Sequence, residues 1–191
     1  MGMPLHAEHT WTPEDIVALP DDGQRHECID GVHLVTPAPM EPHQRGLGTL
    51  FRVVSAFADS AGIGPTYLSP ADLRLTTGTL VQPDLFVVRV PAGERRPRRW
   101  PDFKHLALAA EVLSPGTARY DRGLKRRHYQ RAGVEEYWIV DLDARLIERW
   151  RPEDERPEMV QGTLVWHPDG AAESLRIDLD ALFEDVMDDV G

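Results

Sequence analysis

The chain has 191 residues, of which 41% are hydrophobic and 28% charged, a length and composition that suit one soluble globular domain with its own core. We therefore expect a single domain over residues 1–191, with 1–10 loosely held. The net charge of −11 argues against broad, nonspecific affinity for nucleic acid, and the single cysteine, Cys28, excludes an internal disulfide.

The same features predict the compartment. A lone cysteine is typical of a reducing environment. No basic-then-apolar leader opens the chain, and its apolar stretches are far shorter than the roughly 20 residues that cross a bilayer. We expect a cytoplasmic protein that does not enter a membrane.

The N-terminal part predicts a short helix and a hairpin. Residues 12–15 read Thr-Pro-Glu-Asp, a capping box with proline at the first helical position. Asp30-Gly31 lies between the short apolar runs 25–29 and 32–36, and an Asp-Gly pair in that setting is a strong hairpin signal. The sequence therefore predicts an N-terminal β-hairpin after the helix.

A long helix and the first sheet strands come next. Apolar residues recur at helical spacing over 41–61. Strand-like segments follow at 66–68, 72–76 and 80–90, and Gly78 is expected to turn the last two into an antiparallel pair.

The second half alternates strands and helices. We expect, in order, a strand at 105–113, a helix at 121–132, strands at 137–140 and 144–150, further strands near 158–166 and 174–177, and a helix at 179–186. Mixed antiparallel strands, flanking helices and a strand–helix–strand unit predict an α/β (α+β) fold with a mixed central β-sheet flanked by helices.

Two acids and a lysine in the middle of the chain indicate chemistry. Asp84 opens an apolar strand after Pro83, and Glu111 lies within another. A carboxylate at the end of a buried strand must be paired, protonated or bound to a metal, because burying it alone costs several kcal/mol, roughly. Both are hard oxygen ligands that suit Mg²⁺ or Mn²⁺.

A helix beyond these strands supplies the third group. Asp121, Lys125 and Tyr129 are spaced four apart and so share one helical face. Lys125 is the candidate to orient or deprotonate a water, or to stabilise developing negative charge. Glu27, in the predicted hairpin, offers a further acid. The alternative is that Glu111 and Lys125 form a buried ion pair without catalytic function.

Positive charge is concentrated around these residues. Residues 89–131 hold 12 of the 21 Lys and Arg and four of the 32 acids, a net +8, while the rest of the chain is −19. The predicted nucleic-acid contacts are Arg95, Arg96, Arg98, Arg99, Arg122 and Arg126. The other interpretation is that the four arginines of 95–99 form a solvated loop.

These motifs resemble a known family. Glu27-Cys28-Ile29-Asp30-Gly31, Pro83-Asp84, the run 111–117, Asp121 with Lys125 and Tyr129, and the run 133–141 are similar to the Uma-two family of restriction endonuclease-like proteins, over about residues 12–185. That family is assigned to the PD-(D/E)xK superfamily, with a mixed four-stranded sheet core.

The resemblance implies Asp84 and Glu111 as metal ligands and Glu27 as an accessory acid. It also implies His43 as a residue near the site. One departure is that Leu113 stands where the superfamily has its lysine, so the resemblance implies a lysine that has moved to the next helix, here Lys125.

Two functions remain open from the sequence. The first is a Mg²⁺- or Mn²⁺-dependent endonuclease that cleaves DNA. The alternative is a noncatalytic binding or assembly protein that keeps the nuclease fold, which the net charge and Leu113 favour. We also consider a homodimer, because two sites facing opposite strands suit cleavage of a duplex.

Overall fold

A six-stranded mixed sheet forms the centre of the computed structural model, which describes residues 10–90 and 93–187. The strand order is β3-β4-β5-β6-β7-β8, and among these pairs β5 and β6 are parallel while the others are antiparallel. The strands are β3 (Thr66–Leu68), β4 (Leu85–Val88), β5 (Leu106–Val112), β6 (Tyr137–Asp141), β7 (Leu146–Trp150) and β8 (Glu158–Val160).

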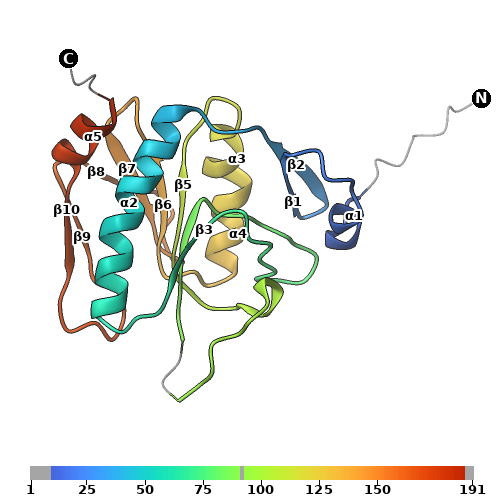
Figure 1. Cartoon of the computed structure of the whole chain (residues 1–191), viewed down its shortest axis with the longest axis horizontal. Helices are drawn as coiled ribbons and strands as arrows, with labels where there is room; N and C mark the ends of the chain where they lie inside the picture. The colour runs from blue at the N-terminus through green and yellow to red at the C-terminus, as the bar shows by residue number, and fades with distance from the viewer. Residues whose placement is uncertain (1–9, 91–92, 188–191) are drawn as a thin grey trace, which may run out of the picture.

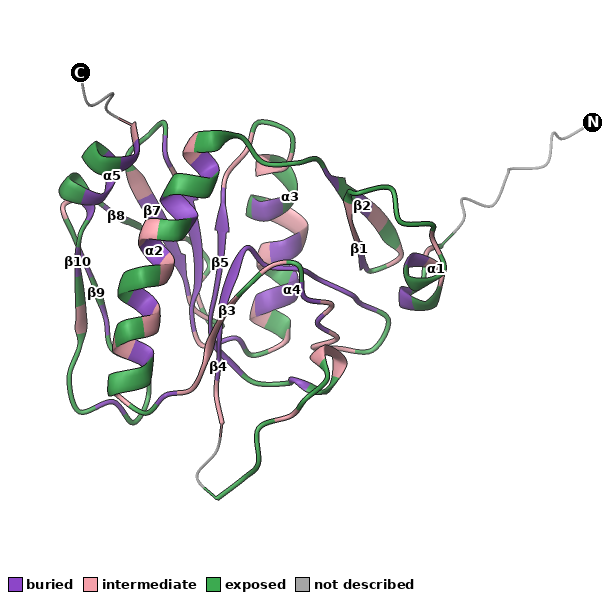
Figure 2. Cartoon of the chain, in the orientation of Figure 1, coloured by how far each residue is buried: buried purple, intermediate pink, exposed green. Residues whose placement is uncertain are grey.

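Helices cover both faces of this sheet (Figure 1). One face packs against the long helix α2 (Glu41–Ser60), which in turn contacts α5 (Leu179–Met187). The other face packs against one continuous helical run, α3 (Ala118–Tyr120), η2 (Asp121–Lys125) and α4 (Arg126–Arg131), which makes the crossover between β5 and β6. Figure 2 shows the result, with buried central strands and an exposed outer side of α2. The predicted mixed sheet with flanking helices is confirmed.

Two small two-stranded sheets lie outside the central one. The N-terminal hairpin pairs β1 (Arg25–Ile29) with β2 (Val32–Thr36), as predicted. Asp30 and Gly31 turn it with φ angles of 50° and 80°, the left-handed conformation that a two-residue hairpin loop requires. At the other end of the chain, β9 (Thr163–Trp166) pairs with β10 (Leu175–Asp178). The remaining elements are α1 (Pro13–Val17) and η1 (Trp100–Asp102).

The predicted antiparallel strand pair about Gly78 is reduced to one bridge. Residues 72–76 form no strand, and the strand expected from residue 80 begins only at Leu85. A single bridge joins Leu73 to Val81, and Leu80 bridges to Cys28 of the hairpin. The backbone N–H and C=O groups of Leu80 bond to Cys28 of the hairpin. Residues 72–76 and 80–90 therefore do not form a β-ladder with each other.

Two other boundaries differ. The predicted helix from residue 121 begins at Ala118 and contains a π-helical turn, η2. The segment 158–166 is two strands separated by Gln161 and Gly162, because β8 joins the central sheet and β9 turns away to pair with β10. Within the described part of the chain, no helix has the length and hydropathy to cross a bilayer.

Candidate active site

The sheet register brings the two strand acids to the same end. Leu85 of β4 lies opposite Ala110 of β5, so Asp84, just before β4, is level with Glu111. Both point to the face that α4 and the hairpin cover, since Glu111 alternates with Ala110 and Val112, which pack on the α2 side. Two strands that are distant in sequence therefore deliver one pair of buried carboxylates, 2% and 3% exposed.

Asp84 has hydrogen-bond partners on both oxygens. Arg25 Nη1 donates to Oδ1 at 2.6 Å, while His43 Nε2 at 3.1 Å and the Val112 amide at 3.0 Å donate to Oδ2. Burial by itself raises the pKa of Asp84, but the His43 hydrogen bond and the Arg25 charge outweigh it and hold the pKa at about 2. Asp84 is ionised at neutral pH.

Lys125 joins three acids from three different elements. Its Nζ lies 2.8 Å from Glu27 Oε2, 2.9 Å from Glu111 Oε1 and 3.8 Å from Asp121 Oδ1. Burial lowers the pKa of Lys125, but the charges of these three acids reverse that effect and raise it above its ordinary value. The lysine is 2% exposed, and it is a fixed ammonium ion at neutral pH.

The acids around Lys125 are not equivalent. Burial raises the pKa of Glu111 well above its ordinary value, and Lys125 offsets this only in part. Tyr129 also donates to Glu111 Oε1, at 3.2 Å. The other oxygen of Glu27, Oε1, accepts a hydrogen bond from the backbone N–H of Gln82 at 2.8 Å, which holds this side chain in place.

Asp121 is the least satisfied of the four acids. It is 1% exposed, and neither of its oxygens makes a hydrogen bond of good geometry within the described residues, although the Thr117 hydroxyl and Lys125 are near enough to lower its pKa. Burial raises its pKa to about 6, with Lys125 acting in the opposite direction. A buried carboxylate in this state has bonding capacity left for a ligand.

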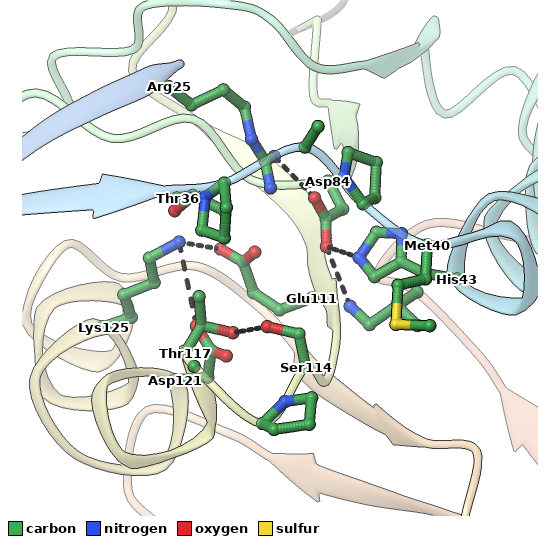
Figure 3. Close-up of a pocket in the computed structure, with 16 residues that line it drawn as sticks. Arg25, Thr36, Met40, His43, Asp84, Glu111, Ser114, Thr117, Asp121 and Lys125 are labelled. Atoms are coloured by element: carbon green, nitrogen blue, oxygen red, sulfur yellow. Dashed lines mark hydrogen bonds and ion pairs between the residues drawn. The ribbon is translucent and has the colours of Figure 1, made fainter.

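Arg25, His43, Asp84, Glu111, Asp121 and Lys125 line one cavity of about 150 Å³, and Glu27 and Tyr129 contact it through Lys125 and Glu111 (Figure 3). Figure 3 shows Lys125 and Glu111 on one side and Asp84, Arg25 and His43 on the other. The loop between β5 and α3 closes the cavity, and there the Ser114 and Thr117 hydroxyls lie 2.9 Å apart. The predicted core residues Asp84, Glu111, Lys125 and Glu27 and the secondary residues Asp121, Tyr129 and His43 are thus brought together by contacts.

The predicted arginine contacts are placed elsewhere. Arg95, Arg96, Arg98 and Arg99 are exposed in the segment that joins β4 to β5, at the end of this strand pair opposite Asp84 and Glu111. Arg126 lies 4.7 Å from the centre of the Trp150 ring, and Arg122 is bound by Glu148 and Asp141. None of these arginines lines the acid cavity.

Arg25 is the site residue that sequence reasoning missed. It comes from β1, 59 positions before Asp84, and its contact depends on how the hairpin docks on the sheet. It also donates to Ser69 Oγ at 3.0 Å. The signal available in the sequence was its place two residues before Glu27, since alternate residues of a strand share a face.

The fit of a metal is decided by the donors and by charge. Within residues 10–90 and 93–187, no three His, Cys, Asp or Glu side chains form a ready-made metal cage. Mg²⁺ needs no such cage, because one or two carboxylates and several waters suffice. Four buried acids here face two permanent cations, Arg25 and Lys125. Because the acids outnumber these cations and the Asp121 oxygens are the least bonded of the four, the donor set fits a divalent ion.

Comparison with known proteins gives the family. The family model Uma2, described as "Putative restriction endonuclease", matches residues 13–183. The chain belongs to the Uma2 family. No curated protein matches it.

A solved structure shares the Uma2 chain's fold. It is described as a putative nuclease belonging to DUF820, from Anabaena variabilis, and it aligns with a TM-score of 0.75 over 93% of this chain and 99% of its own length at 20% identity. At that identity the likeness shows a shared fold and no more. Family and fold together indicate a restriction-endonuclease-like nuclease.

Proposed function

We propose that this protein is a metal-dependent endonuclease that hydrolyses phosphodiester bonds in DNA at the acid cavity. The observation that carries the proposal is the buried Lys125, held by acids from β1, β5 and η2 beside the ionised Asp84. A buried ion cluster of this size contributes little net stability, since desolvation offsets most of its attraction. Its presence in a cavity therefore favours a functional role.

Asp84 and Glu111 are the residues that would hold Mg²⁺ or Mn²⁺, with Asp121 as a further oxygen donor. When bound, a divalent ion supplies a Lewis acid for a phosphate oxygen and lowers the pKa of a water. Arg25 and His43 keep Asp84 ionised and oriented for this purpose.

Lys125 acts as a fixed positive charge in this proposal. Its raised pKa leaves no neutral amine at neutral pH, so it stabilises negative charge that develops on the phosphate instead of removing a proton from water. Glu27 positions the lysine, and Tyr129 orients Glu111. The lysine reaches the acids from the crossover helix, and Leu113, directly after β5, stands where the resemblance places a lysine.

The test is cleavage of supercoiled plasmid and of single-stranded DNA with Mg²⁺ or Mn²⁺. We expect Asp84→Asn and Lys125→Ala each to reduce the rate at least 100-fold, as removal of one transition-state-stabilising group does. Matched controls are the exposed Glu173→Gln and Lys104→Ala, the second at the only other lysine of the chain. Unchanged cleavage by folded Asp84→Asn would show that the proposal is wrong.

The second candidate is a noncatalytic binding or assembly protein. It is favoured by one observation, that hydrogen-bond donors of the chain itself already occupy both oxygens of Asp84. Cleavage that requires metal and is lost in Glu111→Gln would exclude it. DNA as the substrate, the cytoplasm as the compartment and a homodimer as the assembly are further parts of our proposal, and sedimentation of the purified chain tests the last.

A further inference from the structure

A second cavity adjoins the acid cavity and has a different chemistry. It has a volume of about 460 Å³, within the range that small organic ligands occupy. It shares four wall residues with the acid cavity, Met40, His43, Ser114 and Pro115. It lies where α2 and α3 begin and α5 ends, at one end of the molecule in Figure 1. A nucleic-acid strand with one phosphate at the acid cavity would have the adjoining nucleotide at this second cavity.

The walls of the second cavity are mainly apolar. Met40, Leu113, Leu142 and Met187 contribute large side chains. Met40 is 75% exposed and lines both cavities, and Figure 3 shows its side chain beside His43. A flexible thioether of this kind packs well against a flat ring.

Arg122 gives this cavity a rigid planar wall. Its Nε donates to Glu148 at 2.5 Å and its Nη2 to Asp141 at 2.7 Å, so two of its three nitrogens are fixed by carboxylates. The side chain remains 42% exposed and lines the cavity. A guanidinium whose edge is occupied still offers its flat face, on which nucleic-acid bases stack.

The charges disfavour phosphate as the occupant. Asp141 and Glu148 compensate the charge of Arg122, and Asp143 also lines the cavity. A phosphate in the cavity would meet the carboxylates of Asp141 and Asp143, whereas a neutral base meets apolar walls, a guanidinium face and acceptors for its amino groups. Arg122, expected from the sequence to contact nucleic acid, is thereby suited to a base and not to the backbone.

We propose that this cavity binds the nucleobase next to the scissile phosphate, unstacked from its neighbours, against the face of Arg122. The inference rests on the proposed nuclease function and adds a subsite to it. The substrate is then single-stranded DNA, or a duplex from which one base has been extruded.

The experiment uses short single-stranded DNA in which one abasic residue is moved stepwise along the sequence. With the native chain and Mg²⁺ or Mn²⁺, we expect the abasic residue to slow cleavage roughly 5- to 100-fold at one position beside the cut, the range of a lost stacking interaction. Ala118→Phe, which fills the cavity, should slow cleavage of the intact strand to a similar extent and abolish the effect of the abasic residue.

Arg122→Lys separates stacking from charge. It keeps the positive charge and removes the plane, so we expect it to behave like Ala118→Phe, with melting curves to confirm folding. The controls are the exposed Ala56→Phe and Arg127→Lys, neither of which lines the cavity. Full activity in Arg122→Lys together with loss in Arg122→Ala would mean a charge contact and overturn the inference.

The remaining outcomes are equally decisive. Equal cleavage of every abasic strand overturns the base subsite and leaves the nuclease intact. No cleavage of any strand by the native chain overturns both proposals.

Discussion

Asp121 is the residue whose environment predicts the clearest pH effect. Its pKa is about 6 in the folded chain against an ordinary 3.8, because burial disfavours its charge. Between these values the folded state holds a proton that the unfolded state has released, so stability falls as the pH rises from about 4 to about 6. The penalty is complete above that window and corresponds to about 3 kcal/mol.

We therefore expect Asp121→Asn to be more stable than the native chain at pH 7.5, by up to about 3 kcal/mol. The difference should shrink towards zero near pH 4, where Asp121 of the folded chain is protonated. Urea unfolding in metal-free buffer at both pH values measures it.

The exposed Asp169→Asn is the control for this comparison, and it should show no such dependence on pH. A variant Asp121→Asn that is less stable than the native chain at pH 7.5 would mean that Lys125 and the other neighbours stabilise the ionised Asp121.

The π-helical turn η2 is the element that shapes the site. It carries Asp121 and Lys125, and both side chains are buried under the sheet. Such turns are rare and occur often at functional sites, since they cost helix stability. Gly123 lies within η2, where an added Cβ would meet nothing within 4 Å.

Gly123→Ala should therefore stabilise the chain by about 0.5–1 kcal/mol, the difference in helix propensity between these residues. We expect cleavage to be retained, because the contacts of Lys125 hold the turn in place. Chemical denaturation and the plasmid assay together test this. Stabilisation accompanied by loss of cleavage would show that the turn needs glycine to keep its π geometry.

How far the sequence predicts the structure differs from element to element. The hairpin, the long helix and the acids were predictable because turn chemistry and periodicity are local signals. The segment 72–76 was not, because Leu80 finds its partner in Cys28, a contact 52 positions away. The contact of Arg25 with Asp84 is also distant in sequence and so could not be predicted. The π-helical turn was missed because a helical pattern of apolar residues does not distinguish one π turn from an α-helical turn.

At the scale of the molecule, the exposed positive charge lies apart from the candidate active site. The exposed arginines between β4 and β5 lie at one end of the strand pair, and the acids lie at the other. The net charge of −11 repels DNA at long range. Binding of a negatively charged substrate at the acid cavity therefore depends on local contacts there and on neutralisation of the buried acids.

The last prediction follows from that surplus of acid charge. A divalent ion bound by the folded chain alone raises the melting midpoint, by about 2.7 kcal/mol when its concentration is 100 times Kd. For a chain of this length that corresponds to roughly 5–10 °C. We expect this shift with millimolar Mg²⁺ or Mn²⁺ at pH 7.5, measured by calorimetry at constant ionic strength.

The shift should be smaller at pH 5, because Asp121, whose pKa burial raises to about 6, then holds a proton that competes with the ion. Asp84→Asn should lose the shift, and Glu173→Gln, an exposed acid far from the cavity in sequence, should keep it. Identical midpoints with and without metal at pH 7.5 would favour the noncatalytic protein, since the acids would then be satisfied by the chain's own partners in the described residues, Arg25, His43 and Lys125.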